Sequence, residues 1–380
     1  MGRTPLLAQR PVGENKNDLG LICSIILLLG LGLVTLYVAS ANSALRLFDD
    51  ELHFLKRQIV SISIGLVFCA FCAYVNFDFL RKCLPYIVIG SFILCVLTFF
   101  PGIGVERNGA KRWIRLPFIN TFQPSEAAKV AVVLFLANLF EKKSDILDDA
   151  KKTIYPAVIG LFAFVLVVFL QDDFSSAMFI GLIGIAMFFI AGTKIRWFFL
   201  FLLFALPTAV LFIFTKEYRV LRLIAFLRPE YDLQGLNYQI FTAKNAISSG
   251  GFFGKGLGGI ELVNKIPEVQ ADFIFAGWVE AMGFLGVILY MAILGFFIYK
   301  SLRTAMECED LFRSFVAYGC TMIIALQSFM NCGVVCGALP STGIPLPFFS
   351  SGGSSMIMTL GICGLLINVS KNKSVNGENL

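Results

Sequence analysis

The segment Lys265–Gly286, KIPEVQADFIFAGWVEAMGFLG, indicates what kind of fold this chain adopts. One carboxylate, Asp272, opens an apolar run in which no other side chain ionises until Glu280. The apolar character continues over residues 272–300, and a helix needs about 20 such residues to cross the hydrocarbon core of a bilayer. The segment therefore predicts a membrane-spanning helix with an acid at its mouth.

The composition of the whole chain agrees with this interpretation. Of the 380 residues, 57% are hydrophobic and only 15% are charged, whereas about a quarter of the residues in a soluble domain are charged. The mean hydropathy is +0.80. We therefore expect a multispanning membrane protein, and we attribute the net charge of +6 to membrane orientation, anionic lipid or an anionic substrate and not to nucleic acid.

Ten apolar runs satisfy the length test for membrane-spanning helices. They lie near residues 19–40, 58–75, 83–100, 127–140, 155–171, 176–191, 197–214, 272–300, 311–334 and 352–370. The predicted fold is an all-α integral membrane protein with ten transmembrane helices within residues 19–370. A large extracytoplasmic loop, 215–271, joins the seventh helix to the eighth. The run 127–140 is short, so we expect it to pack against other helices and not against lipid.

The distribution of Lys and Arg predicts the orientation of the chain. An even number of helices places both polar tails, residues 1–18 and 371–380, on one side of the membrane. Cations in the short loops of that side indicate the cytoplasm. The remaining cations concentrate in two long loops on the other side, 101–126 and 215–271, where they need another explanation.

The first cationic loop continues into a helix that carries its own charges, ERNGAKRWIRLPFINTFQPSEAAKVAVV, residues 106–133. Lys111 and Arg112 suit phosphate oxygens, although they could equally form a basic collar against lipid headgroups. Pro124 begins the helix, so Glu126 and Lys129 lie three residues apart on one face. An ionisable pair inside a membrane indicates function; the alternative is an N-terminal acid favoured by the helix dipole.

Three further loop features belong to the same side. QDDFSSA contributes Asp172 and Asp173; two adjacent acids cannot point the same way, so at most one faces a cavity, and capping of the next helix is the alternative role for one of them. The loop 215–271 holds many glycines, which allow backbone to approach a phosphate, and it delivers Asp272 to the membrane surface. The segment 331–355 contains three prolines, and backbone broken in this way needs protein or a water-filled cavity around it. A structural plug is the alternative.

The cysteines do not indicate a metal centre or a disulfide framework. Ten cysteines lie mostly within apolar runs, and His53 is the only histidine. Small buried hydrophobic side chains are the expected role of these cysteines.

Five motifs resemble, in order along the chain, the signatures of the SEDS family. They are GAKRWI with QPSEAAK, RLIAFLRPEYDLQGLNYQ, SSGGFFGKGLGG, PEVQADFIFA and LPSTGIPLPFFSSGGSS. This is the family of shape, elongation, division and sporulation proteins. The resemblance implies a peptidoglycan glycosyltransferase that polymerises lipid II at the outer face of the cytoplasmic membrane and releases undecaprenyl pyrophosphate. It also implies a class B penicillin-binding protein as transpeptidase partner, with other divisome proteins and membrane lipids around it.

The resemblance assigns roles to individual residues. The family's essential aspartate falls on Asp272, its cavity-lining pair on Glu126 and Lys129, and the acid of its Q-P-D motif on Asp173. The residues expected to bind substrate, from these motifs and from the basic cluster, are Lys111, Arg112, Gln123, Ser125, Glu126, Lys129 and Asp173. The leaving pyrophosphate would be stabilised by Lys or Arg, with or without a divalent cation such as Mg²⁺ or Mn²⁺; no other cofactor is expected.

The chain departs from the family pattern at several positions. Gln270 and Ala271 replace the usual His-Thr before the essential acid, Asp172 replaces a proline, and Ser351 replaces a tyrosine. Where the family pattern has a second Glu directly after the position of Glu280, this chain has Ala281. Two of the motifs are more similar to the cell-division type, FtsW: GKGLGG followed by KIPE, and NGAKRWI. One motif, LPSTGIPLPFF, is more similar to the elongation type, RodA. We favour the division type, with a location at the division septum.

The expected reaction begins at Asp272, acting as the general base that removes the proton from the acceptor's GlcNAc 4-hydroxyl. The alternative from another class is a transporter, such as a lipid II flippase or a proton-coupled carrier, that uses Glu126, Lys129 and Asp173. Carriers place coupling residues near the membrane midplane, whereas these acids gather at one face, which favours an enzyme. A scaffold without activity would leave the ionisable groups unexplained.

Overall fold

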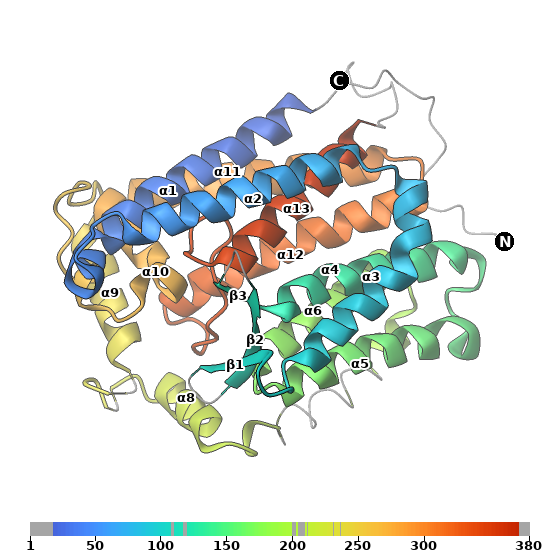
Figure 1. Ribbon diagram of the computed structural model, residues 1–380, viewed down its shortest axis with the longest axis horizontal. Coiled ribbons are helices and arrows are strands. Elements are labelled where there is room, and N and C mark those ends of the chain that lie inside the picture. Colours follow the sequence, from blue (N-terminus) through green and yellow to red (C-terminus); the bar gives the residue numbers. More distant parts are fainter. Residues whose placement is uncertain are drawn as a thin grey trace.

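The computed structural model describes residues 18–107, 110–116, 120–199, 203, 210, 212–230, 232–235 and 237–371. Long helices pack side by side along the longest axis of the molecule, and one small sheet lies among them towards one end (Figure 1). The helices long and apolar enough to cross a membrane are α1 (Leu19–Phe48), α2 (His53–Tyr74), α3 (Phe77–Leu97), α5 (Tyr155–Leu170, preceded by a π turn from Ala150), α11 (Ile274–Glu307), α12 (Leu311–Val335) and α13 (Gly353–Ser370).

Two further helices complete the described bundle. They are α4 (Pro124–Lys142) and α6 (Phe174–Ile190). With the seven long helices, they account for nine of the ten runs expected from the sequence, which confirms the all-α membrane fold. Most of α4 is buried, as its short apolar run predicted, and it packs against α3, α6 and α12. The run near 197–214 lies mostly outside the described residues, so the count of ten stays a prediction.

Ion pairs identify one end of the bundle. Arg81 at the start of α3 lies 3.5 Å from both Glu141, at the end of α4, and Asp310, before α12. Lys371 donates to a carbonyl near the end of α2, and Asp18 pairs with a lysine in the last part of α11. We call this the terminal end, because the first and last described residues lie there. The rest of the two tails lies outside the described residues, so the placement of both termini on one side of the membrane stays a prediction.

The opposite end, which we call the loop end, gathers the non-helical segments. It holds the turn between α1 and α2, the sheet, the segment 336–352, and the short helices α8 (Glu217–Leu227), α9 (Tyr238–Gly250) and α10 (Val269–Asp272). The sheet is antiparallel in the order β1 (Gly104–Arg107), β2 (Ala110–Leu116) and β3 (Asn120–Phe122). The sequence had predicted only a loop over 101–126.

The chain crosses from one end to the other between α6 and α8. Lys194 pairs with Asp148 at 3.0 Å at the terminal end, whereas Arg219 of α8 pairs with Asp172 at 3.1 Å at the loop end. The run 197–214 itself lies mostly outside the described residues, so its helix stays a prediction.

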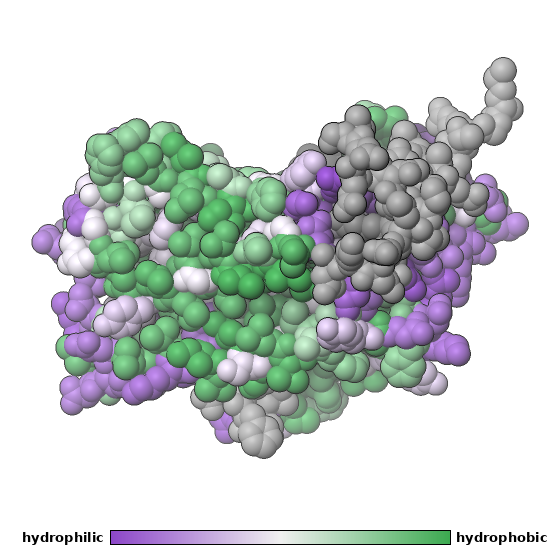
Figure 2. Space-filling view, turned by 90° about the horizontal axis from the view of Figure 1, so that it is seen from above, coloured by the Kyte–Doolittle hydropathy of each residue, from purple (hydrophilic) through white to green (hydrophobic). Residues whose placement is uncertain are grey.

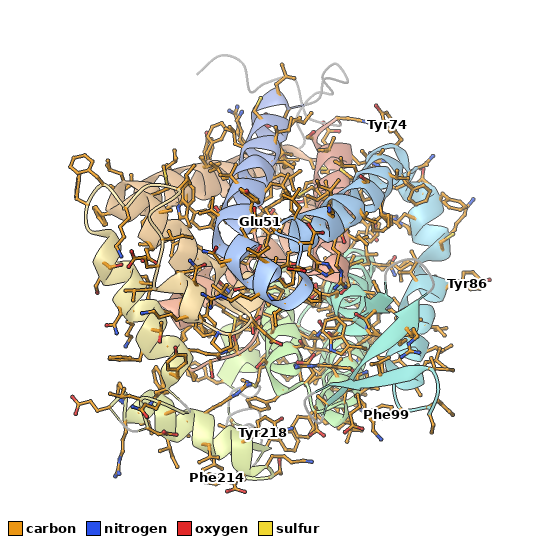
Figure 3. The ribbon with its side chains drawn as sticks, turned by 60° about the vertical axis from the view of Figure 1, so that its left-hand side comes forward. Glu51, Tyr74, Tyr86, Phe99, Phe214 and Tyr218 are labelled. Atoms are coloured by element: carbon orange, nitrogen blue, oxygen red, sulfur yellow. The ribbon has the colours of Figure 1, made fainter. Side chains whose placement is uncertain are left out.

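An apolar surface covers the middle of the bundle on the face drawn in Figure 2. In Figure 2 hydrophobic residues cover the centre of the face, and hydrophilic residues gather towards its two ends. Figure 3 shows Tyr74 and Tyr86 projecting outward at the periphery, where they are 80% and 78% exposed. Apolar surface of this extent is expected to face lipid, and aromatic side chains favour its boundaries with water.

The long helix α11 is broken near the loop end, which corrects the continuous helix predicted over 272–300. Gly283 has φ 63° and ψ −160°, and the helix begins at Ile274, two residues after the acid. Four backbone hydrogen bonds of 2.9–3.1 Å join residues 280–285 to the loop 251–256. The loop thus satisfies the peptide groups that the break releases, as a membrane environment requires.

The segment 336–352 is fixed against the helices around it. Gln58 of α2 donates to the Ser350 carbonyl at 3.1 Å, and Phe348 is buried with φ 68°. A non-glycine residue with this φ is strained and needs support from its surroundings. Support comes from Gly32 of α1, where an added Cβ would overlap the Phe348 carbonyl.

We therefore expect Gly32→Ala to destabilise the protein by about 1–3 kcal/mol, because overpacking against backbone has little room to relax. Gly30→Ala is the matched control in the same helix, since a Cβ there meets nothing within 4 Å. It should be neutral or slightly stabilising. Thermal unfolding of both variants in the same detergent measures the difference, and equal midpoints would contradict this account of Gly32.

Candidate active site

Asp272 lies at the loop end, in a short helix of its own. It is the last residue of α10, and Phe273 with φ −113° and ψ 15° separates it from α11. Asn331 of α12 donates to the backbone carbonyls of Asp272 and Ile344, both at 2.9 Å. The backbone of the acid is therefore tied to a transmembrane helix and to the segment 336–352, while its side chain stays half-buried.

The surroundings of Asp272 favour its neutral form. Burial, and then the nearby Glu268 carboxylate, raise the pKa of Asp272 to about 6, and the guanidinium groups of Arg112 and Arg222 oppose this rise. A carboxyl group with such a pKa can take up or release a proton close to neutral pH, as a general base must.

Arg222 was not among the residues predicted from the sequence. It comes from α8, whose placement over the acid no local pattern reveals, and it donates to the Ser341 carbonyl at 3.4 Å. Its guanidinium lies 5.8 Å from the centre of the Tyr218 ring, and Figure 3 shows Tyr218 at the loop end. Arg222 and Arg112 thus reach Asp272 from two different elements.

The strand β2 separates the two cations that were predicted to act together. Successive side chains of a strand point to opposite faces. Arg112 shares a face with the buried Ala110 and Ile114, and its guanidinium lies 3.8 Å from Asp173. Lys111 is exposed on the other face. The structure therefore brings Arg112 to the acids and leaves Lys111 facing away from them.

Asp173 is buried and connects three elements. It caps α6 by accepting from the Ser176 amide at 3.2 Å, and it accepts from Gln123, the residue before α4, at 2.9 Å. Asp172 turns away with φ 61° and pairs with Arg219 of α8. Only one of the two adjacent acids faces the cluster, as expected from their positions, and the same acid is also the cap.

Glu126 and Lys129 form the ion pair that their spacing predicts, with a distance of 2.8 Å. Both are buried, and Lys129 also donates to Gln327 of α12 at 3.1 Å. Gln327 in turn donates to the Pro345 carbonyl at 2.9 Å. Ser125 is buried beside this pair, and its hydroxyl has no hydrogen-bond partner among the described residues.

Gln327 and Asn331 are functional candidates that the sequence analysis missed. They lie four residues apart, and therefore on one face of α12, where one binds Lys129 and the other holds the backbone of Asp272. The signal was available, because two amides at this spacing interrupt an otherwise apolar run. The structure thus joins the predicted Glu126–Lys129 pair to the predicted base through α12.

The chain is similar to known proteins over nearly its whole length. Residues 19–375 match the family described as cell cycle protein, FTSW_RODA_SPOVE. A protein of Geobacter sp. (strain M18) named probable peptidoglycan glycosyltransferase FtsW is 39% identical over 93% of this chain and 96% of its own length. Stage V sporulation protein E of Bacillus subtilis (strain 168) is 36% identical over 94% of this chain and 98% of its own length.

Two solved structures share the fold. A chain from a study of the structural coordination of polymerization and crosslinking by a peptidoglycan synthase complex is 28% identical. It has a TM-score of 0.78 over 95% of this chain and 99% of that chain. The rod shape determining protein RodA of Thermus thermophilus is 25% identical, with a TM-score of 0.70 over 94% of this chain and 97% of its own.

The buried ion pair leads to a test by paired substitutions. Glu126→Gln or Lys129→Met alone should cost about 3–5 kcal/mol of folding free energy, because each leaves one buried charge unpaired. The double variant should cost less than the sum of the two. Denaturant unfolding in detergent measures all three, and strictly additive losses would contradict the pairing. Lys56→Met is the control, because it breaks an exposed pair and should change stability by less than about 1 kcal/mol.

Proposed function

Because the chain belongs to the SEDS family of cell cycle proteins, we propose that it is a peptidoglycan glycosyltransferase that polymerises lipid II for septal wall synthesis. The chain spans nearly the full length of its relatives, so the activity is assigned to the whole chain. The observation that carries the mechanism is the tethered Asp272, whose carboxyl pKa is raised to about 6 by burial against the opposing influence of the Arg112 and Arg222 guanidinium groups.

In the proposed reaction Asp272 takes the proton of the acceptor's GlcNAc 4-hydroxyl. The hydroxyl oxygen forms a bond to the anomeric carbon of the donor as the bond from that carbon to the pyrophosphate oxygen breaks. The electron pair of the broken bond leaves with undecaprenyl pyrophosphate, and the proton stays on Asp272 until solvent removes it. The glycan grows by one disaccharide unit in each cycle.

Arg112 and Arg222 are the groups best placed to bind the pyrophosphate, because planar guanidinium groups match phosphate oxygens in a bidentate manner. Gln123, which is half-buried, would contact the rest of the donor, and the buried Ser125, Asp173 and Glu126–Lys129 pair would support this part of the site from behind. Lys111 is exposed on the other face of β2, which favours the lipid-headgroup role for this residue. A divalent cation remains compatible with the pyrophosphate, but the proposed steps do not depend on one.

The depth of the ion pair favours an enzyme over a carrier. Glu126 and Lys129 lie two and five residues after Pro124, the start of α4 at the loop end, and therefore only about 3 Å and 8 Å along the helix axis. Coupling residues of carriers lie near the midplane instead. The names of the relatives favour the division type over the elongation type.

We infer the surroundings of the enzyme from the same placement. The proposed location is the cytoplasmic (inner) membrane. Polymerisation of lipid II at its outer face requires the loop end to face outward, and both termini then lie in the cytoplasm. A class B penicillin-binding protein is the proposed transpeptidase partner, supported by the structural similarity to a chain from a complex for polymerization and crosslinking. The division septum is the proposed site of action.

The base leads to two linked expectations for purified protein acting on labelled lipid II. Asp272→Asn should lower the polymerisation rate by about 100-fold or more, because the amide cannot take the proton. The control is Glu51→Gln, which changes an exposed acid of the same end (Figure 3) and should retain the wild-type rate.

The pH dependence of the wild type gives the second expectation. Only the ionised carboxylate is active, so the rate should halve near pH 6 and fall about tenfold per pH unit below it. An acid limb near pH 4, or wild-type polymerisation by Asp272→Asn, would remove Asp272 as the base.

The opposite faces of β2 give a second test. Arg112→Lys should lower turnover at fixed lipid composition, because an ammonium does not replace a bidentate guanidinium. Arg112→Gln should also move the acid limb to higher pH, since it removes a cation that favours the ionised form of Asp272. Lys111→Gln is the matched control and should change neither property. Equal effects at the two positions would indicate a lipid-binding collar for both.

A further inference from the structure

Glu280 is a fully buried carboxylate that the proposed reaction does not use. It lies in α11, eight residues after Asp272 and just before the break at Gly283. Its Oε1 accepts from Lys255 Nζ at 2.9 Å. Its other donors, all from the loop 249–263, are Ser249 Oγ at 3.3 Å and the amides of Glu261 (3.2 Å), Leu262 (3.2 Å) and Val263 (2.9 Å, to Oε2).

A buried charge is tolerated only where paired charges or hydrogen bonds replace its hydration. Here one ammonium, one hydroxyl and three amides converge on a single carboxylate, so the loop 249–263 is the solvation shell of Glu280. Because the side chain is 0% exposed and protein donors surround its carboxylate, Glu280 is not placed to touch a substrate.

The backbone of the same loop fills the break in α11. The amides of Lys255 and Gly256 donate to the carbonyls of Glu280 and Ala281, both at 3.0 Å. An added Cβ at Gly254 would overlap the Ala281 carbonyl, so the loop lies directly against the helix. Side chain and backbone therefore fix the loop to one place on α11.

The amide–carboxylate bond from Val263 to Glu280 closes the chain between these two residues into a ring, and Asp272 lies within this ring. On one side of Asp272, the chain from Val263 runs through a turn that α9 anchors. The Tyr238 hydroxyl and the Gln239 side-chain amide each donate a hydrogen bond of 3.2 Å to a backbone carbonyl of this turn. On the other side, the helical segment from Ile274 leads directly to Glu280. The position of Asp272 thus depends on the closure of the ring.

We propose that Glu280 is a positioning residue for the general base: its carboxylate closes the ring that holds Asp272 against the substrate site. This inference rests on the proposed function, because it concerns where the base lies during glycosyl transfer. A small displacement of a reacting group can cost two orders of magnitude in rate, so loss of the closure should affect turnover more than substrate binding.

The direct test is Glu280→Gln in the full-length protein, assayed on labelled lipid II in vesicles of fixed composition. The amide has nearly the same shape, but its NH₂ group faces a donor whichever way it is oriented. We expect kcat to fall about tenfold to 100-fold with KM within about twofold of wild type. Glu230→Gln makes the same chemical change at an exposed acid of the same long loop and should leave both constants unchanged.

Two readouts separate positioning from a general loss of structure. Amide hydrogen exchange at residues 261–263 should accelerate in Glu280→Gln, while exchange in α12 and α13 stays unchanged. The acid limb of the pH profile should move to lower pH, because a loosened ring admits water to Asp272 among Glu268, Arg112 and Arg222. Lys255→Met removes one donor and keeps the carboxylate, so it should produce the same changes to a smaller extent. If Glu280→Gln fails to fold, this variant tests the positioning role in its place.

The outcomes are distinguishable from failure of the proposed function. If the wild type makes no polymer under conditions where it is folded, the proposed function is wrong. If the wild type polymerises and a folded Glu280→Gln keeps its kcat, acid limb and exchange rates, only the positioning role is wrong. A rise in KM at unchanged kcat would also overturn it, because that result would assign Glu280 to substrate binding.

Discussion

The structure depends on one constraint, which is that peptide groups within a membrane need hydrogen-bond partners inside the protein. The break at Gly283 would leave such groups unpaired in α11, and the loop 251–256 supplies their partners. A segment that the sequence analysis placed in a loop outside the membrane therefore completes the backbone hydrogen bonding of a transmembrane helix. This constraint fixes the loop, and the loop delivers Asp272 to its place.

Three acids at the loop end show how environment separates roles among identical groups. Glu280 has five donors and no exposure, which suits a structural charge. Asp173 caps a helix and binds Gln123 beside Arg112, which suits a group that holds and orients. The backbone of Asp272 is tethered by Asn331, and its side chain is half-buried. Burial raises the pKa of its carboxyl group, and the Arg112 and Arg222 guanidinium groups oppose the rise. Of the three, Asp272 has the most accessible side chain, and its raised pKa suits a general base.

The sequence was most informative where a pattern is local. Hydropathy predicted the helices, a three-residue spacing predicted the Glu126–Lys129 pair, and adjacency predicted that Asp172 and Asp173 diverge. It was least informative where partners are distant in the chain. Arg222 reaches Asp272 from a helix 50 residues earlier, and strand alternation, which separates Lys111 from Arg112, could not be applied to a segment taken as a loop. The break in α11 was missed because a single Gly inside an apolar run is also compatible with a continuous helix.

Two of the positions at which the chain departs from the family pattern are in direct contact. The amide of Ser351 donates to the carbonyl of Gln270 at 2.7 Å, which ties the residues before Asp272 to the segment 336–352. Because both partners are backbone groups, the side chains at these positions can change without loss of the bond. The Gln270 side-chain oxygen is buried and has no partner among the described residues, so the exchanged side chain contributes less to the site than the backbone does. This backbone bond adds to the side-chain tethers from Asn331 and Glu280, and it explains how positions 270 and 351 can depart from the family pattern while the base keeps its place.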